Sequence, residues 1–481
     1  MRSALLTLLL AAAPAFAAEA PPGLAACRLA GVEHGAWCGS VKRPLDPTQP
    51  GGTAIDIHFA VLPAVARNKK PDPMFFFAGG PGQSAIALAP QVARLLARFS
   101  NRRDIVLVDQ RGTGRSAPLV CEDAAATRPL REAVDPARQV DELAACRQRL
   151  SALPHGDLRQ YTTAIAVQDV DAVRAVLGAE RINAVGASYG TRAVLEYQRQ
   201  FPQRVRRAVI DGVVPPNMGM PQSFAVDAQA AFDAVFAACA AEAACAQRHP
   251  ALRARWRALL DGLPREVRVR HPFTGADERL TLTREAVAGL VRGPLYAPAL
   301  AAALPQAIDD AAAGRFEALF ALGSALGGPR GLSIAAGMHF SVVCTEDPPR
   351  TDAVPAGAAG DFGAHLAGLY QRICADWPRG QVEPAFYRVP PAAAPVLVLS
   401  GGLDPVTPPR HGARVAQALG ANARHVVVAN AGHGVMALGC LRDALYRFVD
   451  AGTAEQALAT DLRCADGVPR PPAFVPVESQ P

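Results

Sequence analysis

Residues 185–192 read VGASYGTR, which places Ser188 at the centre of the pattern G-x-S-x-G. The apolar run 182–185 leads into it, and a helical pattern over 193–197 follows. Strand, tight turn and helix in this order are the context in which a serine is presented as a nucleophile. Glycines suit the turn because its strained backbone leaves no room for side chains beside the serine. The sequence therefore predicts that Ser188 lies on a sharp turn between a strand and a helix.

Apolar runs on either side of Ser188 predict further strands of the same sheet. These runs lack a regular alternation of polar residues, as in parallel sheets that are covered on both faces. Residues 163–177 repeat apolar side chains at helical spacing, and residues 54–61 alternate as a half-buried strand does. The order of strands and helices predicts an α/β fold with a mostly parallel, doubly wound sheet. The runs are 74–77, 105–108, 182–185, 205–210, 396–399 and 425–428.

The composition changes after this sheet region. From about residue 223 to 379 the chain is rich in alanine, leucine and arginine, with helical patterns and one hairpin at 267–282. Buried-strand runs return only at 396, so we expect a mainly helical cap inserted between two halves of one sheet. The expected boundaries are a signal peptide at 1–17, the catalytic domain at 18–215 and 390–481, and the cap at 216–389.

Composition and charge restrict the class of protein. The chain has 481 residues, of which 50% are hydrophobic and 19% charged, as in globular proteins. Its net charge of +6 comes from scattered arginines without a run of like charges, so no nucleic-acid surface is expected.

The first residues resemble an export signal. Arg2 supplies a positive charge, residues 4–13 form a short apolar core, and Ala15-Phe16-Ala17 is an A-x-A cleavage site. We therefore expect a secreted or periplasmic protein that is cleaved after Ala17. A lipobox ending in Cys27 is the alternative, but the apolar core ends well before it. No later run of about 18 apolar residues predicts a membrane span.

Ten cysteines follow this signal, which indicates disulfide bonds formed in an oxidising compartment. Their spacing falls into five close couples, and we expect each cysteine to pair with its neighbour in sequence. The expected pairs are Cys27 with Cys38, Cys121 with Cys146, Cys239 with Cys245, Cys344 with Cys374, and Cys440 with Cys464.

A nucleophilic serine needs a histidine base that a carboxylate orients. His433 is the preferred base because it lies in a glycine-flanked loop directly after a strand, where catalytic groups gather in open α/β sheets. Asp211 and Asp404 both satisfy the chain order serine, acid, histidine. Asp404 is preferred because its proline-rich loop follows the last strand before the histidine strand, whereas Asp211 is expected to be a buried hydrogen-bonding group. Thr407 could hydrogen-bond Asp404 or its own loop.

The oxyanion of an acyl-transfer reaction requires backbone N–H donors. We expect one from Tyr189, the residue after the nucleophile, and one from Gly80 in the glycine-rich loop 79–82. The loop lacks both phosphate-binding glycine patterns, so a nucleotide site is not expected. The cysteines contain no C-x-x-C, and we expect no metal or other cofactor.

The combined motifs resemble the α/β-hydrolase peptidases that include proline iminopeptidases and secreted tripeptidyl aminopeptidases. The matching segments are GGPG at 79–82, DQRGTGRS at 109–116, GASYG at 186–190, GLD at 402–404 and GH at 432–433. The resemblance implies a triad of Ser188, Asp404 and His433, a helical cap over the site, and cleavage near a free peptide N-terminus. Ala78 departs from the histidine usual in proline iminopeptidases. Arg111 is expected to brace the loop beneath the site.

An aminopeptidase must bind the cationic α-amino group of its substrate, which requires carboxylates. Glu346 and Asp347, next to a cysteine, are the candidates, and a solvated acidic turn is the alternative. The sequence thus favours an exported serine exopeptidase that acts on peptides with a free N-terminus. The alternatives are an esterase or amidase on the same fold, and a catalytically silent binding protein.

Overall fold

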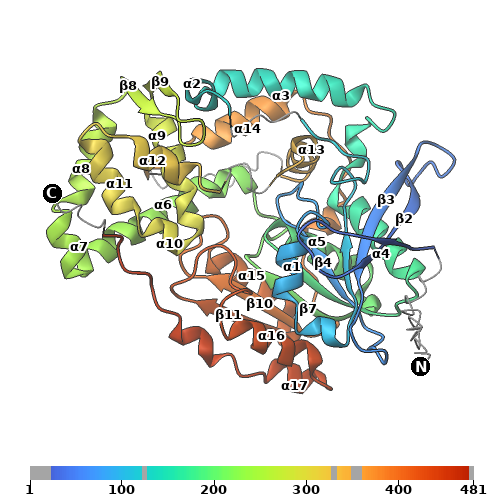
Figure 1. The fold of residues 1–481 in the computed structure, drawn as a ribbon. Coiled ribbons are helices and arrows are strands. Elements are labelled where there is room, and N and C mark those ends of the chain that lie inside the picture. Colours follow the sequence, from blue (N-terminus) through green and yellow to red (C-terminus); the bar gives the residue numbers. More distant parts are fainter. Residues whose placement is uncertain (1–22, 122–126, 327–332, 348–359, 476–481) are drawn as a thin grey trace, which may run out of the picture.

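The structure is a computed structural model that describes residues 23–121, 127–326, 333–347 and 360–475, so the expected signal peptide lies outside the described residues. Within these ranges the framework is a nine-stranded sheet (Figure 1). Its strands are β1 (Ala25–Cys27), β2 (Ala36–Pro44), β3 (Ala54–Leu62), β4 (Met74–Phe77), β5 (Ile105–Val108), β6 (Ile182–Ala187), β7 (Val205–Asp211), β10 (Val396–Gly401) and β11 (Ala423–Val428).

The strand order is β1-β2-β3-β5-β4-β6-β7-β10-β11. From β5 through β11 all neighbouring strands are parallel, whereas β1, β2 and β3 add an antiparallel edge. The predicted mostly parallel sheet is therefore confirmed. The edge strands β1 and β2 are not among the predicted strands, because their partly exposed residues do not form an apolar run.

Alternate residues of the central strands pack into different cores. In β4, Phe75 and Phe77 belong to one apolar cluster and Met74 and Phe76 to another. Helices α4 (Thr163–Val176), α5 (Tyr189–Gln200) and α15 (Pro409–Leu419) contribute to the first cluster. Helices α1 (Ala89–Leu95) and α16 (Leu441–Asp450) contribute to the second. The sheet is thus covered by helices on both faces, as the unbroken apolar runs predict.

Between β7 and β10 the chain forms a mainly helical segment, which we call the cap (Figure 1). It has its own apolar core around Phe232, Trp256 and Phe320. Its elements are α6 (Met220–Ala241), α7 (Ala243–Arg248), α8 (Leu252–Asp261), the hairpin β8 (Arg265–Arg270) and β9 (Asp277–Leu282), α9 (Arg284–Arg292), the 3₁₀ turn η4 (Pro294–Tyr296), α10 (Pro298–Ala301), α11 (Leu304–Ala312), α12 (Glu317–Gly323), α13 (Ala336–Glu346) and α14 (His365–Ala375).

Two helices that precede Ser188 in the sequence also pack on the cap. They are α2 (Leu130–Ala133) and α3 (Pro136–Ser151), and α3 runs along α14 in Figure 1. Leu130 belongs to the apolar core of the cap, and its backbone N–H donates to the Glu278 carboxylate of β9 at 2.7 Å. We therefore propose that the cap includes residues 130–151 in addition to the expected 216–389.

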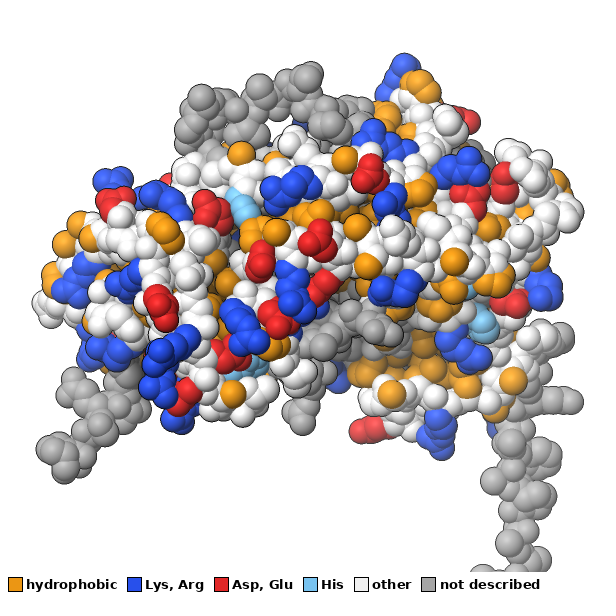
Figure 2. Space-filling model, turned by 90° about the horizontal axis from the view of Figure 1, so that it is seen from above, with side chains coloured by type: hydrophobic (Ala, Val, Ile, Leu, Met, Phe, Trp, Pro, Cys, Tyr) orange, Lys and Arg blue, Asp and Glu red, His pale blue; other side chains and the backbone are white. Residues whose placement is uncertain are grey.

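One helical segment of the described residues, Gln222–Ala241 of α6, is long and apolar enough to cross a membrane by length and composition alone. Its buried side chains Phe232, Val235 and Phe236 lie in the core of the cap, and buried core helices of water-soluble proteins pass the same criterion. On the face drawn in Figure 2, basic and acidic side chains are interspersed and do not form a single basic stripe.

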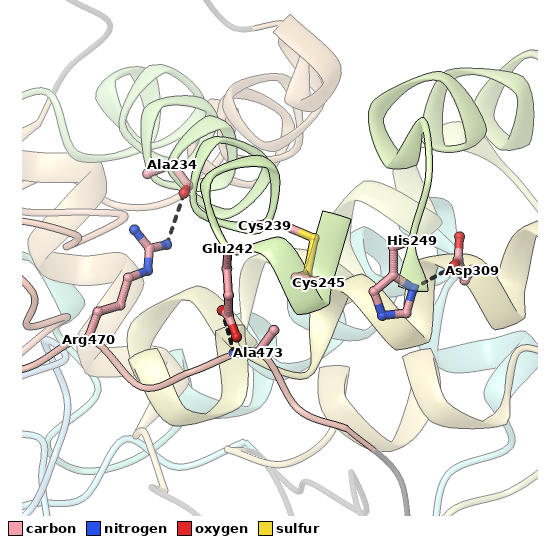
Figure 3. The surroundings of a disulfide bond; sticks show 8 residues. All are labelled: Ala234, Cys239, Glu242, Cys245, His249, Asp309, Arg470 and Ala473. Atoms are coloured by element: carbon pink, nitrogen blue, oxygen red, sulfur yellow. Dashed lines mark hydrogen bonds and ion pairs between the residues drawn. A yellow bond between two sulfur atoms is a disulfide. The ribbon is translucent and has the colours of Figure 1, made fainter. Parts of the chain in front are cut away.

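The cysteines form five disulfides, which match the neighbour pairing expected from their spacing. Because Cys27 is bonded to Cys38, its sulfur is not free to carry a lipid, as the lipobox alternative would require. The pair Cys239–Cys245 joins α6 to α7 inside the cap (Figure 3). Five bonded pairs and no free thiol suit an oxidising compartment.

The segment that follows the last helices returns to the cap. The Arg470 guanidinium donates to the Ala234 carbonyl at 2.9 Å, and the Ala473 N–H donates to the Glu242 carboxylate at 3.2 Å (Figure 3). These contacts connect the C-terminal part of the chain to α6.

Candidate active site

Ser188 lies on a strained turn between β6 and α5. Its backbone has φ 56° and ψ −127°, a conformation that is rare for residues other than glycine. A Cβ on Gly186 would lie 2.6 Å from the Gly190 carbonyl oxygen, and a Cβ on Gly190 would overlap the Phe77 carbonyl oxygen of β4. Both glycines of G-x-S-x-G are therefore required by close backbone packing, and the predicted strand, turn and helix are present.

Asp404 and His433 contact each other at the ends of neighbouring strands. The Asp404 Oδ2 atom lies 2.8 Å from His433 Nδ1, and Asp404 is fully buried, whereas 16% of the His433 side chain is exposed. Burial alone would lower the pKa of His433, but the charge and hydrogen bond of Asp404 raise it above its ordinary value. The pair can therefore hold an imidazole in one orientation and stabilise its protonated form.

The loop around Asp404 supplies three hydrogen bonds to its carboxylate, in addition to the contact with His433. The N–H groups of Val406 and Thr407 donate to Asp404 Oδ1 at 2.9 and 2.8 Å. The Thr407 hydroxyl donates to Oδ2 at 2.6 Å and lies 3.1 Å from His433 Nδ1. Both carboxylate oxygens are therefore saturated, which fixes the face that Asp404 presents to His433.

Asp211 is a second buried carboxylate near the histidine, but it does not contact the imidazole. Its Oδ2 accepts from the N–H groups of Val435 and Met436 at 2.7 and 2.8 Å, directly after the histidine loop. Among the described residues its Oδ1 has no partner, and burial raises the pKa of Asp211 to about 6. Asp211 is thus a buried hydrogen-bonding group that anchors the residues following His433.

Ser188 and His433 both lie beside the segment formed by Asp211 and Gly212. The Ser188 N–H donates to the Asp211 carbonyl at 2.9 Å. A Cβ on Gly212 would lie 3.1 Å from His433 Cε1, so the imidazole lies directly over this glycine. Within the described part of the chain, Ser188 Oγ makes no hydrogen bond. Nucleophile–base contacts commonly become short only when a substrate is bound.

The glycine-rich loop after β4 lies beside Ser188. A Cβ on Gly79 would lie 3.2 Å from Ser188 Cβ, and Gly80 has φ 109°, which favours glycine. The N–H of Gly80 donates to no group in the ranges the structure describes, and the Tyr189 N–H lies in the first turn of α5. Both expected oxyanion donors therefore remain free beside the nucleophile.

The cap holds this loop in place through α13. The Ala335 N–H donates to the Gly82 carbonyl at 2.9 Å. His339 Nδ1 lies 3.2 Å from the Pro81 carbonyl, and its Nε2 lies 2.8 Å from the Tyr370 hydroxyl. Burial lowers the pKa of His339 to about 4, so the imidazole is neutral, with Nδ1–H donating to Pro81 and Nε2 accepting from Tyr370. No sequence pattern predicts this contact, because it joins segments more than 250 residues apart.

Glu346 and Asp347 lie in a buried ion-pair network. Glu346 accepts from the Thr163 N–H and hydroxyl at 2.6 and 2.8 Å, and Thr163 in turn contacts the Tyr189 hydroxyl at 2.7 Å. Arg192 of α5 donates to both Asp347 oxygens at 2.8 and 2.9 Å. Both carboxylates are at most 5% exposed, which disagrees with a solvated turn and does not favour the expected contact with a substrate ammonium.

Arg111 occupies the bracing position expected for it. Its guanidinium is buried and donates to both carboxylate oxygens of Asp169 on α4 at 2.7 and 3.0 Å. It also donates to the carbonyls of Leu45 and Gln160 at 2.7 and 2.9 Å. Arg111 thus connects the loop after β5 to three other segments, and it does not contact Ser188 or His433.

The 3₁₀ turn η4 of the cap contacts the histidine loop. The His433 N–H donates to the Tyr296 carbonyl at 2.9 Å, and the two rings pack edge to face with centroids 5.2 Å apart. A Cβ on Gly432 would overlap the same carbonyl, so the glycine beside the histidine permits this approach. In the described ranges, no group of three His, Cys, Asp or Glu side chains is placed to hold a metal ion.

Two family models match separate regions of this chain, and a curated relative matches most of its length. Residues 72–250 match the family model described as alpha/beta hydrolase fold, and residues 359–464 match the one described as TAP-like protein. Serine protease Hip1 of Mycobacterium tuberculosis is 28% identical over 423 residues, which cover 81% of this chain and 80% of Hip1.

Two further relatives carry different activities in their names. The tripeptidyl aminopeptidase of Streptomyces lividans is 32% identical over 197 residues, 37% of this chain and 36% of that protein. Carboxylesterase B of Mycobacterium tuberculosis is 28% identical over 479 residues, 89% of this chain and 86% of that protein. With the doubly wound sheet and the serine on its strained turn, these matches assign the chain to the α/β-hydrolase serine peptidases, the family that includes the tripeptidyl aminopeptidases.

Proposed function

We propose that this protein is an exported serine peptidase that removes short fragments from the free N-terminus of peptides. The observation that carries the proposal is the 2.8 Å contact between Asp404 and His433 beside a serine on a strained turn. In this proposal Ser188 is the nucleophile, His433 the general base and Asp404 the orienting acid. The five disulfides support export, because such bonds persist in oxidising compartments.

The proposed reaction uses groups that are already oriented. His433 takes the proton of the Ser188 hydroxyl as Oγ attacks the scissile carbonyl, and the oxyanion accepts the N–H groups of Gly80 and Tyr189. The protonated His433 then gives its proton to the leaving amine, the peptide C–N bond breaks, and the acyl group remains on Ser188 as the acyl-enzyme. Water repeats the sequence and releases the N-terminal fragment. Asp404 stabilises the imidazolium in both halves of the reaction, in keeping with its raising effect on the pKa of His433.

Cleavage near the N-terminus is supported by the cap and by the tripeptidyl aminopeptidase relative. Cap elements contact both sides of the site, through His339 at the oxyanion loop and Tyr296 at the histidine loop. A site covered on both sides suits the end of a peptide better than its middle. Because Glu346 and Asp347 are paired with Arg192, we do not propose them as the groups that bind the substrate ammonium.

An esterase or amidase is the second candidate, and the similarity to Carboxylesterase B favours it. The same three side chains catalyse any acyl transfer, so the triad does not decide between the two activities. The requirement for a free amino group on the substrate distinguishes the two activities, since an esterase needs no free ammonium.

Two measurements test the proposal. Labelling with a fluorophosphonate probe should modify Ser188 and should be absent in Ser188→Ala, whereas a silent binding protein would not react. Cleavage of a peptide library with free or acetylated N-termini should then show kcat/KM at least about tenfold higher for the free peptides, since a charge-assisted hydrogen bond contributes roughly 1.5–3 kcal/mol. Equal cleavage of both sets, together with rapid hydrolysis of simple esters, would establish the esterase alternative.

A further inference from the structure

Arg292 lies at the C-terminal end of α9, in the part of the cap that contacts the histidine loop. It is four residues before Tyr296, the residue that packs on His433, and its Nη2 lies 3.5 Å from the Tyr296 hydroxyl. Its guanidinium also lies over the Phe224 ring of α6, with 5.0 Å between Cζ and the ring centroid. Arg292 is therefore separated from the proposed catalytic histidine by one aromatic ring.

The surroundings of this site are aromatic and apolar. Phe224 and Tyr370 pack against the same small cluster of Val214, Met218, Met220 and Val343. The Tyr370 hydroxyl in turn is hydrogen-bonded to His339, which contacts the glycine-rich loop 79–82. Phe224 and Tyr296 thus give the guanidinium an aromatic environment next to the histidine side of the proposed reaction centre.

Arg292 has no carboxylate partner within the part of the chain that the structure describes. Its Nε atom is buried and makes no hydrogen bond to any residue that the structure describes, although the side chain as a whole is only partly buried. Four of the five buried arginines of the described residues are paired with carboxylates, as Arg111 is with Asp169 and Arg192 with Asp347, whereas Arg207 donates to backbone carbonyls. An arginine that is partly removed from water and has no carboxylate partner among the described residues is suited to bind an anion from solution.

The position beside His433 determines which part of a substrate would meet the arginine. In serine acyl transfer the protonated histidine donates to the leaving amine, so the leaving group lies on the histidine side. Tyr296 packs on His433, and Arg292 contacts the Tyr296 hydroxyl, so both residues belong to the histidine side of the site. Arg292 is therefore nearer to the expected position of the leaving residue than to that of the N-terminal fragment.

We infer that Arg292 forms a carboxylate-binding subsite for the leaving fragment of the substrate. This inference rests on the proposed peptidase activity and adds a preference on the other side of the cleaved bond. The carboxylate comes either from an acidic side chain of the first leaving residue or from the C-terminus of a one-residue leaving fragment. Both present the two oxygens that a guanidinium binds through paired N–H groups.

The test uses a peptide that library profiling has shown to be cleaved. Two pairs of variants are made from it: Asp or Asn as the first leaving residue in a carboxamide-ended peptide, and a one-residue leaving fragment ending in a free carboxylate or a carboxamide. In the wild-type protein, kcat/KM should be at least about tenfold higher for the anionic member of one pair or of both, as a charged hydrogen bond implies. The pair that responds identifies the source of the carboxylate.

Substitutions then assign the preference to Arg292. In Arg292→Gln the anionic-to-neutral ratio should fall to within about twofold of one, and Arg292→Lys should keep part of it as a point charge. Arg284→Gln removes a partly exposed arginine at the other end of α9, where it pairs with Asp261 and Asp361, and should leave the ratio as in the wild type. A wild-type ratio near one in both pairs, or an unchanged ratio in Arg292→Gln, would overturn the inference.

The same substrates carry a free or an acetylated N-terminus, which separates this result from that of the proposed function. Loss of the acetyl effect with a preserved anionic preference would contradict N-terminal specificity alone. Preserved N-terminal specificity without an anionic preference would contradict the subsite alone. If Arg292→Gln does not fold, the ratio measured in Arg292→Lys and in the charge-reversed Arg292→Glu, expected below one, decides the question.

Discussion

The substitution Asp404→Asn changes one atom of the proposed triad and leaves its shape intact. Asp404 Oδ1 accepts two backbone N–H groups, so in the variant the amide oxygen is expected to occupy this position. The amide nitrogen then replaces Oδ2, where it faces the Thr407 hydroxyl and His433 Nδ1. An N–H that points at Nδ1 makes this atom an acceptor and moves the imidazole proton to Nε2. The histidine then has no lone pair available for the Ser188 hydroxyl.

The size of the effect follows from this tautomer change. Loss of the correct tautomer in a serine–histidine–aspartate site lowers kcat by about 10⁴. This corresponds to about 5.4 kcal/mol of transition-state stabilisation. The acid limb of the kcat/KM profile provides a second readout. Because Asp404 raises the pKa of His433, its replacement makes protonation harder and moves this limb to lower pH.

The matched control is Asp211→Asn. Asp211 Oδ2 accepts the N–H groups of Val435 and Met436, and an amide oxygen can accept both of them. The histidine tautomer is unaffected, so kcat should fall by less than about tenfold. Steady-state hydrolysis by both variants, with circular dichroism to verify the fold, measures the difference. A larger loss in Asp211→Asn than in Asp404→Asn would refute the assignment of the acid.

Three further outcomes test the structure itself. Gly190→Ala should lower the free energy of unfolding, measured in urea, by more than about 3 kcal/mol, because its methyl group would overlap the Phe77 carbonyl. The control Gly289→Ala, at an exposed position in α9, should raise the free energy of unfolding by about 0.5–1 kcal/mol. Peptide mapping without reductant should recover the five neighbour pairs of cysteines, and any crossed pair would contradict the fold. Glu346→Gln should destabilise the protein by about 1–3 kcal/mol through the Arg192 network and leave the ratio of free to acetylated peptide cleavage unchanged. If Glu346→Gln instead abolished the preference for free over acetylated peptides and left the free energy of unfolding unchanged, Glu346 would be a substrate-binding residue.

The parts of the fold that could be predicted depend on local sequence. The turn at Ser188 was predictable because a strand, two glycines and a helix fall within about twenty consecutive residues, and each has its own pattern. The loops that carry Asp404 and His433 follow apolar strands in the same way. The cysteine pairs were predictable because each closes a short loop, with separations of 6 to 30 residues.

Contacts between the cap and the sheet could not be predicted from such patterns. The sequence places Glu346 and Asp347 in an acidic pair, but their partner Arg192 lies more than 150 residues earlier. A free carboxylate and a paired one look alike in the sequence. Arg292 was missed for the same reason, since its environment depends on how α9 packs against α6. The burial of a charged side chain is decided by tertiary packing, which a single sequence does not reveal.

The hydrogen bonds from α13 to the glycine-rich loop have a consequence for protein engineering. Chimeras in which one relative's cap replaces another's are a common way to transfer substrate preference. Here Ala335 and His339 hold the carbonyls of Gly82 and Pro81, so such an exchange also replaces the support of the proposed oxyanion donor Gly80. A chimera that retains residues 335–346 of its host should keep its turnover and change only its choice of substrate. One that exchanges them should be slow on every substrate, activated esters included.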